Sequence, residues 1–125
     1  MIIIGNKHIP HSVFINILCI DDISNTQSNS VVIFLYDIEI IKYCQKNNIQ
    51  NAVIVNNITE SIFCNNLDVD FIIVKNDISK QVQSIAQNYM FDSKILQIIK
   101  DDKDIQNIAI NEIDGCIYDN LLKGK

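Results

Sequence analysis

The chain has 125 residues and a formal net charge of −5, and 48% of its residues are hydrophobic. Its ten basic residues are all lysines, so it lacks the arginine side chains that grip phosphate groups and read guanine edges. Because phosphate neutralisation drives nucleic-acid affinity, we do not expect this acidic chain to bind nucleic acid. The length is typical of one domain, and we predict a single domain over residues 1–125.

The sequence also predicts a cytoplasmic protein without membrane contact. No positively charged segment precedes an apolar run at the start, which argues against a signal peptide. The uninterrupted apolar runs fall far short of the roughly 18 residues that a membrane span needs. The four cysteines form no C-x-x-C motif, and three of them lie in apolar runs, as expected for small buried side chains in a reducing compartment.

Residues 1–30 predict a β-appendage and a connector. Residues 2–9, IIIGNKHI, place two short apolar runs about Gly5-Asn6, a pattern typical of a β-hairpin. Residues 13–19 suit another strand, and the polar segment 24–30 is too short to link two domains. We expect the appendage at the edge of a larger sheet or across one of its ends.

Residues 31–125 predict a core of alternating strands and helices. Short unbroken apolar runs are typical of strands buried on both faces. They cover residues 31–36, 52–55, 71–74, 94–99 and 115–118. The intervals between them carry apolar residues at helical spacing, which predicts helices over residues 38–47, 58–65, 78–91 and 101–111.

Polar residues mark the ends of these predicted helices. Asn57 and Glu60 have the spacing of a capping box, and Asp77 and Asp101 stand where an N-cap is expected. Since glycine is scarce, we expect asparagine to adopt the left-handed conformation that ends a helix. The expected stops are KNNI, CNNL and INEI, at residues 46–49, 64–67 and 110–113.

Consecutive βα units with short connections imply right-handed crossovers and a parallel sheet. We therefore predict an α/β fold with a small three-layer, doubly wound parallel sheet of about five strands, flavodoxin-like in outline, plus the N-terminal hairpin. An open half-barrel of βα units is the alternative that the pattern leaves open.

In such sheets ligands bind beyond the carboxyl ends of the strands, so this rim is the candidate site. The residues that follow the predicted strands there are Asp37, Asn57, Lys75, Asp77, Lys100 and Asp119. None of these turns contains glycine, which argues against a phosphate cradle at a helix start. The simplest interpretation is that the acids cap helices.

A magnesium site is the alternative interpretation of the rim. Asp37 and Glu39 follow one strand, and Asp77 joins them if the strand before it is a neighbour; carboxylates suit Mg²⁺. The stretch LYDIE resembles the strand-end aspartate of haloacid-dehalogenase-type phosphatases, with Asp37 in the place of the first acid. That family expects a second aspartate where Glu39 stands.

Two further resemblances add no activity. NILCIDDIS (16–24) looks like the opening strand of a response-regulator receiver domain, with Asp21 and Asp22 as its paired acids, but the terminal-strand lysine of that family is absent. As a whole the chain resembles a small bacterial protein family of repeated βα units. The stretches that suggest it are IIIGNKHIPH, QNYMFDSKIL (87–96) and NEIDGCIY (111–118).

The sequence thus leaves two functions open. The first is a non-enzymatic module that binds a protein partner or a second copy of itself through an exposed apolar surface or edge strand and needs no cofactor. The alternative is an Mg²⁺-dependent enzyme acting on a phosphate ester through Asp37, Glu39 and Asp77. In that case Lys75 or Lys100 would pair with the negative charge of the substrate.

Overall fold

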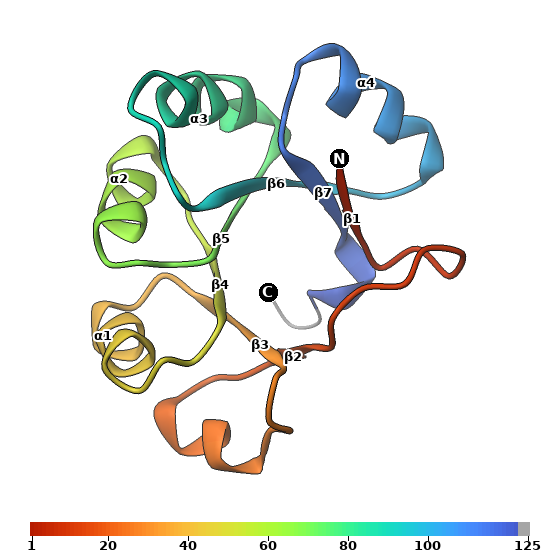
Figure 1. The fold of residues 1–125 in the computed structure, drawn as a ribbon. Helices are drawn as coiled ribbons and strands as arrows, with labels where there is room; N and C mark the ends of the chain where they lie inside the picture. Colours follow the sequence, from red (N-terminus) through yellow and green to blue (C-terminus); the bar gives the residue numbers. More distant parts are fainter. Residues whose placement is uncertain (123–125) are drawn as a thin grey trace.

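The computed structural model of the chain describes residues 1–122. Seven strands alternate with helices and short 3₁₀ turns (Figure 1). The strands are β1 (Ile2–Ile4), β2 (Phe14–Asn16), β3 (Val31–Leu35), β4 (Asn51–Ile54), β5 (Phe71–Val74), β6 (Lys94–Ile99) and β7 (Gly115–Tyr118). The α-helices are α1 (Ile38–Lys46), α2 (Ile58–Asn66), α3 (Asn76–Asn88) and α4 (Ile105–Ile110). The 3₁₀ turns are η1 (Ile20–Asn25), η2 (Asp102–Asp104) and η3 (Asp119–Leu121).

All seven strands form one parallel sheet in the order β1-β7-β6-β5-β4-β3-β2. The five predicted core strands are present, but the predicted total of about five is wrong because the N-terminal segment adds two more. The predicted hairpin about Gly5-Asn6 is also wrong. β1 pairs with β7 and β2 pairs with β3, so these consecutive strands lie at opposite edges of the sheet.

The sheet is curled, and its helices lie around the outer side (Figure 1). The prediction of a doubly wound sheet with helices on both faces is therefore wrong, and the alternative, a βα half-barrel, is confirmed. The curl brings distant strands together on the inner side, where the ring centroids of Phe14 and Phe71 are 5.5 Å apart. These rings come from β2 and β5, which a flat sheet would hold about 14 Å apart, three strand spacings.

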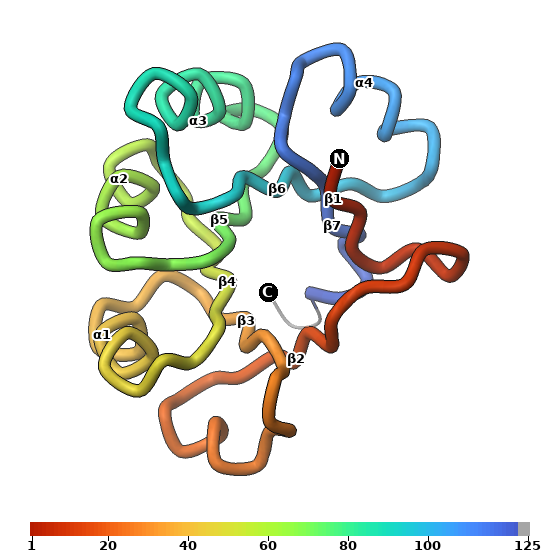
Figure 2. The backbone as a smooth tube through the Cα atoms, viewed as in Figure 1, coloured from red at the N-terminus to blue at the C-terminus, as the bar shows by residue number. Residues whose placement is uncertain are grey.

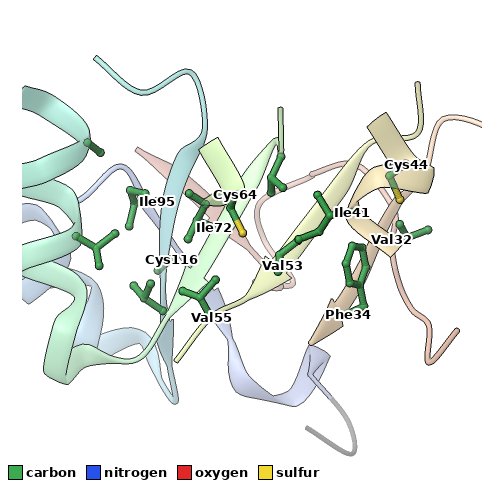
Figure 3. Close-up of a cluster of buried hydrophobic side chains, with 14 of the residues drawn as sticks. Val32, Phe34, Ile41, Cys44, Val53, Val55, Cys64, Ile72, Ile95 and Cys116 are labelled. Carbon is green, nitrogen blue, oxygen red and sulfur yellow. The ribbon is translucent and has the colours of Figure 1, made fainter. Parts of the chain in front are cut away.

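The outer face of the sheet and the helices enclose the larger of two apolar cores (Figure 3). Val32 and Phe34 of β3, Val53 of β4 and Ile72 of β5 face the helices, and each is at most 1% exposed. Helix α1 contributes Ile41 to this core. Alternate residues of each strand meet the helices, as the two-residue period of a strand requires.

The inner face forms a second core to which none of α1–α4 contributes a residue, whereas Leu121 of η3 packs against it. Strand residues of the other parity fill this core, and the curl of the sheet and the residues after β7 bury them. Its buried members are Ile4, Val31, Ile33, Ala52, Ile54, Ile73, Leu96 and Ile117, with Leu122 from beyond the last strand.

The four α-helices end in the same way, as expected of a repeated βα unit. The residues that end them, however, differ from the predicted ones. Each helix is followed by a residue with positive φ: Asn48 (56°), Asp68 (62°), Met90 (51°) and Glu112 (57°). The next residue then donates its N–H to a carbonyl five residues back, as in Ile49 to Cys44 and Val69 to Cys64. This is the Schellman arrangement. Asparagine was predicted at three stops and takes the left-handed position only at Asn48.

None of the helices within residues 1–122 is both long and apolar enough to cross a membrane, and the longest, α3, has 13 residues.

Candidate functional site

At the carboxyl ends of β3 and β4, the predicted site residues cap helices. The Asp37 carboxylate accepts hydrogen bonds from the N–H groups of Glu39 (2.9 Å) and Ile40 (3.3 Å) at the start of α1. Asn57 accepts from the N–H of Glu60 (2.9 Å) at the start of α2, and Glu60 in turn accepts from the N–H of Asn56 (2.9 Å). Both side chains thus satisfy backbone donors that a helix start leaves without partners.

The residues after β5 correct one detail of the prediction. Helix α3 begins at Asn76, its N-cap is Lys75, and no side chain makes the capping hydrogen bond. Asp77 lies one residue inside the helix rather than at its cap, where its charge still suits the positive end of the helix dipole. The expected cap is therefore wrong, although the acid does stand in the first turn.

Beyond β6, the rim is again organised around helix-start hydrogen bonds. The Asp104 carboxylate accepts from the N–H groups of Lys100 (3.0 Å) and Asp101 (3.3 Å). These backbone donors lower the pKa of Asp104 below its usual value. Asp101 accepts from the N–H of Lys103 (2.9 Å), so the predicted cap at Asp101 is present, on η2. Beyond β7, Asp119 opens η3.

The structure does not bring together the three carboxylates of the hypothetical magnesium site. Asp37 and Glu39 line a hollow of about 300 Å³ together with Asp21, between η1 and α1. Asp77 belongs to a different part of the rim, because β4 lies between β3 and β5. Within residues 1–122 no group of three or more His, Cys, Asp or Glu side chains is placed to hold a metal ion.

We expect Mg²⁺ to leave the thermal stability of the protein unchanged. A site filled at about 100 times its dissociation constant would add about 2.7 kcal/mol to the free energy of unfolding, whereas Asp37 is already engaged with its own helix. Differential scanning fluorimetry with about 5 mM MgCl₂ should therefore move Tm by less than about 1 °C. A rise of several degrees that the substitution Asp37→Asn abolishes would restore the magnesium hypothesis.

Three side chains at the rim form a hydrogen-bonded cluster that the sequence did not predict. The Asn6 side chain donates to the Tyr118 hydroxyl (3.0 Å) and to the Asp102 carboxylate (3.3 Å). The Tyr118 hydroxyl donates to the same carboxylate, and this bond raises the pKa of Tyr118 above its usual value. The three side chains link the end of β1, η2 and the end of β7. No spacing could have found a set of residues up to 112 positions apart.

The opposite end of the sheet also carries polar pairs that hold strands in register. Asp70 accepts from the N–H of Asn51 (3.0 Å), and the Asn51 side chain accepts from the N–H of Asp70 (3.3 Å). Burial raises the pKa of Asp70. Asp114 accepts from the N–H of Ile95 (2.9 Å) in a similar way at the next pair of strands. These residues lie at the amino ends of strands, the end of a βα barrel where polar groups serve stability rather than chemistry.

The buried cysteines are unsuited to nucleophilic chemistry. Burial raises the pKa of the Cys44 and Cys116 thiols to about 11 and that of Cys64 to about 12. Thiols of this kind stay protonated at neutral pH, and the thiolate is the reactive form. The predicted burial is confirmed for these three, two of which show their sulfur atoms in Figure 3, whereas Cys19 is exposed.

An apolar hollow lies between α2 and α3, apart from the carboxyl ends of the strands. It measures about 630 Å³, and its apolar lining residues are Ile62, Ile85, Tyr89 and Phe91. A second hollow of about 520 Å³ shares Ile85 and extends the groove toward Ile58 and Lys80. We call the two hollows together the α2–α3 groove.

The fold places the protein in the class of all-parallel βα half-barrels with helices on the outer face. No protein-family model matches the chain, and no curated protein matches it in sequence.

Proposed function

We propose that this protein is a non-enzymatic cytoplasmic module that binds an amphipathic helix of a partner protein in the α2–α3 groove. The observation that carries the proposal is the apolar groove of about 630 Å³ between two neighbouring outer helices. Grooves between helices bind amphipathic helices by accepting side chains spaced one helical turn apart. The four free cysteines fit a reducing compartment.

Two of the large apolar side chains that line the groove are exposed to water. Tyr89, just after α3, is 77% exposed, and Ile62 of α2 is 37% exposed. Their chain neighbours Met90 and Phe63 are 85% and 51% exposed. Exposed apolar surface of this kind is typical of interaction sites, and aromatic residues and methionine are enriched at protein interfaces.

The charge of the groove favours a particular partner. Its lining contains Lys80 and no aspartate or glutamate, although the whole chain has a net charge of −5. An acidic residue on the bound helix would meet Lys80 while apolar residues enter beside Tyr89. A basic or polar helix would lack this pairing.

Magnesium-dependent phosphate chemistry has weaker support. It requires Asp37, Glu39 and Asp77 to share an ion, whereas the strand order separates Asp77 from the other two. Asp37 is bonded to the first turn of its own helix.

The test uses amphipathic helical peptides displayed on phage and selected on the whole protein. We expect selected peptides to carry apolar residues at i, i+3 or i+4 and i+7 with an acid at one end. The substitution Tyr89→Asp should weaken the selected peptide at least about tenfold, equal to about 1.4 kcal/mol. The control Tyr43→Asp changes a tyrosine on α1, 37% exposed and outside the groove, and should leave affinity unchanged.

Light scattering of the free protein distinguishes the two kinds of occupant. A monomer supports a partner protein, and a dimer that Tyr89→Asp dissociates would show that a second copy fills the groove. Selected peptides that bind equally to both tyrosine variants would overturn the groove as the binding site.

A further inference from the structure

The half-barrel has a seam where its two edge strands face the same gap. β1 and β2 are consecutive in sequence but lie at opposite ends of the sheet order. A curled sheet brings those ends toward each other, and Figure 2 shows the chain between β1 and β2 passing across this side of the molecule. Within residues 1–122 no strand pairing crosses the seam.

The chain after β7 contacts both sides of the seam. Leu121 lies against Gly5 at the end of β1, where its Cδ1 is 3.0 Å from the position that a Cβ on Gly5 would take. On the other side, the Asn16 side chain of β2 donates a hydrogen bond of 2.6 Å to the Leu121 carbonyl oxygen. Leu122 is 7% exposed and completes the inner core, which Phe14 of β2 also joins.

We propose that residues 119–122 are a strap that closes the seam in place of an eighth strand, and that its release frees β2 and opens the inner core. The strap continues directly from β7, so it moves with the β1–β7 side of the seam. The Asn6–Asp102–Tyr118 hydrogen bonds fix that side further. On the β2 side the strap accepts the Asn16 hydrogen bond, and Leu122 packs in the inner core that Phe14 joins.

The closure of the seam differs in kind from the strand pairs. A ladder between neighbouring strands repeats its backbone hydrogen bonds along their length, whereas the strap meets β2 through the Asn16 side chain and the inner core through its leucine side chains. β2 has three residues, and its strand partner within residues 1–122 is β3. Local opening free energies follow the number of such contacts, so β2 is the element that the strap controls.

Native-state hydrogen exchange of the full chain tests the strap. The reporter is the N–H of Ile17, which donates to the Ile33 carbonyl across the β2–β3 pair at 2.9 Å. In Asn16→Ala, which removes the bond to Leu121 at an exposed position, we expect exchange of the β2 amides to rise about tenfold while β4 and β5 stay protected. Leu122→Ala should do the same and increase the fluorescence of an apolar dye such as ANS.

The matched control is Asn47→Ala. It removes a similar bond, from the Asn47 side chain to the Tyr43 carbonyl at 2.9 Å, but far from the seam, and it should leave β2 exchange unchanged. Unchanged β2 exchange in Asn16→Ala would overturn the proposal. So would an equal rise in all strands, because the change would then report global stability.

Discussion

Replacing Gly115 by alanine should detach β1 from β7 and lower the free energy of unfolding by about 3 kcal/mol. A Cβ at this position would lie 2.3 Å from the carbonyl oxygen of Ile2 and 2.6 Å from its Cβ. Because these atoms belong to the main chain of β1 or sit next to it, no side-chain rotation relieves the contact. β1 must move away, and its pairing of Ile2 with Gly115 is lost. Urea unfolding measures the loss, and hydrogen exchange of Ile2–Ile4 locates it.

A chain that lacks residues 1–5 provides the control. The atoms that obstruct the new methyl group are absent from it, so Gly115→Ala should then cost less than about 1 kcal/mol. An equal cost in both chains would mean that Gly115 is required by β7 itself and that β1 is not closely packed against it.

The core strands could be predicted because they are unbroken apolar runs, and a strand buried on both faces needs such a run. The N-terminal strands were harder, since each has three residues. The strand predicted within residues 13–19 is present as β2, but the glycine between the two apolar runs of residues 2–9 is typical of a hairpin. Gly5 does have a positive φ, 106°. It turns the chain away from β1 beneath Leu121 rather than folding it back onto β1. Nothing local in the sequence indicates that β1 pairs with a strand more than a hundred residues away.

The helix stops show a similar limit. Helix periodicity could be predicted, because it follows from packing against the sheet. An apolar residue after the stop was predicted correctly at Ile49 and Ile113, whereas Val69 rather than Leu67 follows the stop of α2. The left-handed residue itself could not, since Asp68, Met90 and Glu112 occupy positions where local preference favours Gly or Asn. The surrounding Schellman hydrogen bonds and the packing of the apolar residue that follows stabilise the unfavourable φ at each of them.

The candidate sites, too, include some features that the sequence predicts and others that it does not. The capping roles of Asp37 and Asn57 depend on neighbouring residues and were visible in the sequence. The α2–α3 groove was not visible, because its lining residue Tyr89 fits a predicted apolar stripe, and the exposure of Tyr89 depends on where α3 ends. The local sequence pattern also does not determine in which direction the sheet curls. A strand buried on both faces has the same apolar pattern whether helices or other strands cover its second face.

Ile72 and Ile73 form a matched pair that tests what covers the inner face of the sheet. Replacing either residue by alanine should lower the free energy of unfolding by about 2–5 kcal/mol. They are neighbours on β5, both 0% exposed, but Ile72 faces the helices whereas Ile73 faces the inner core. No residue of α1–α4 belongs to the inner core, so Ile73 is buried by the curl of the sheet together with the leucines of residues 119–122. Ile110→Ala, at a position 66% exposed on α4, should cost less than about 1 kcal/mol in the same urea titration. A cost for Ile73→Ala near that of Ile110→Ala, with Ile72→Ala still expensive, would mean that the inner face is open to water in solution.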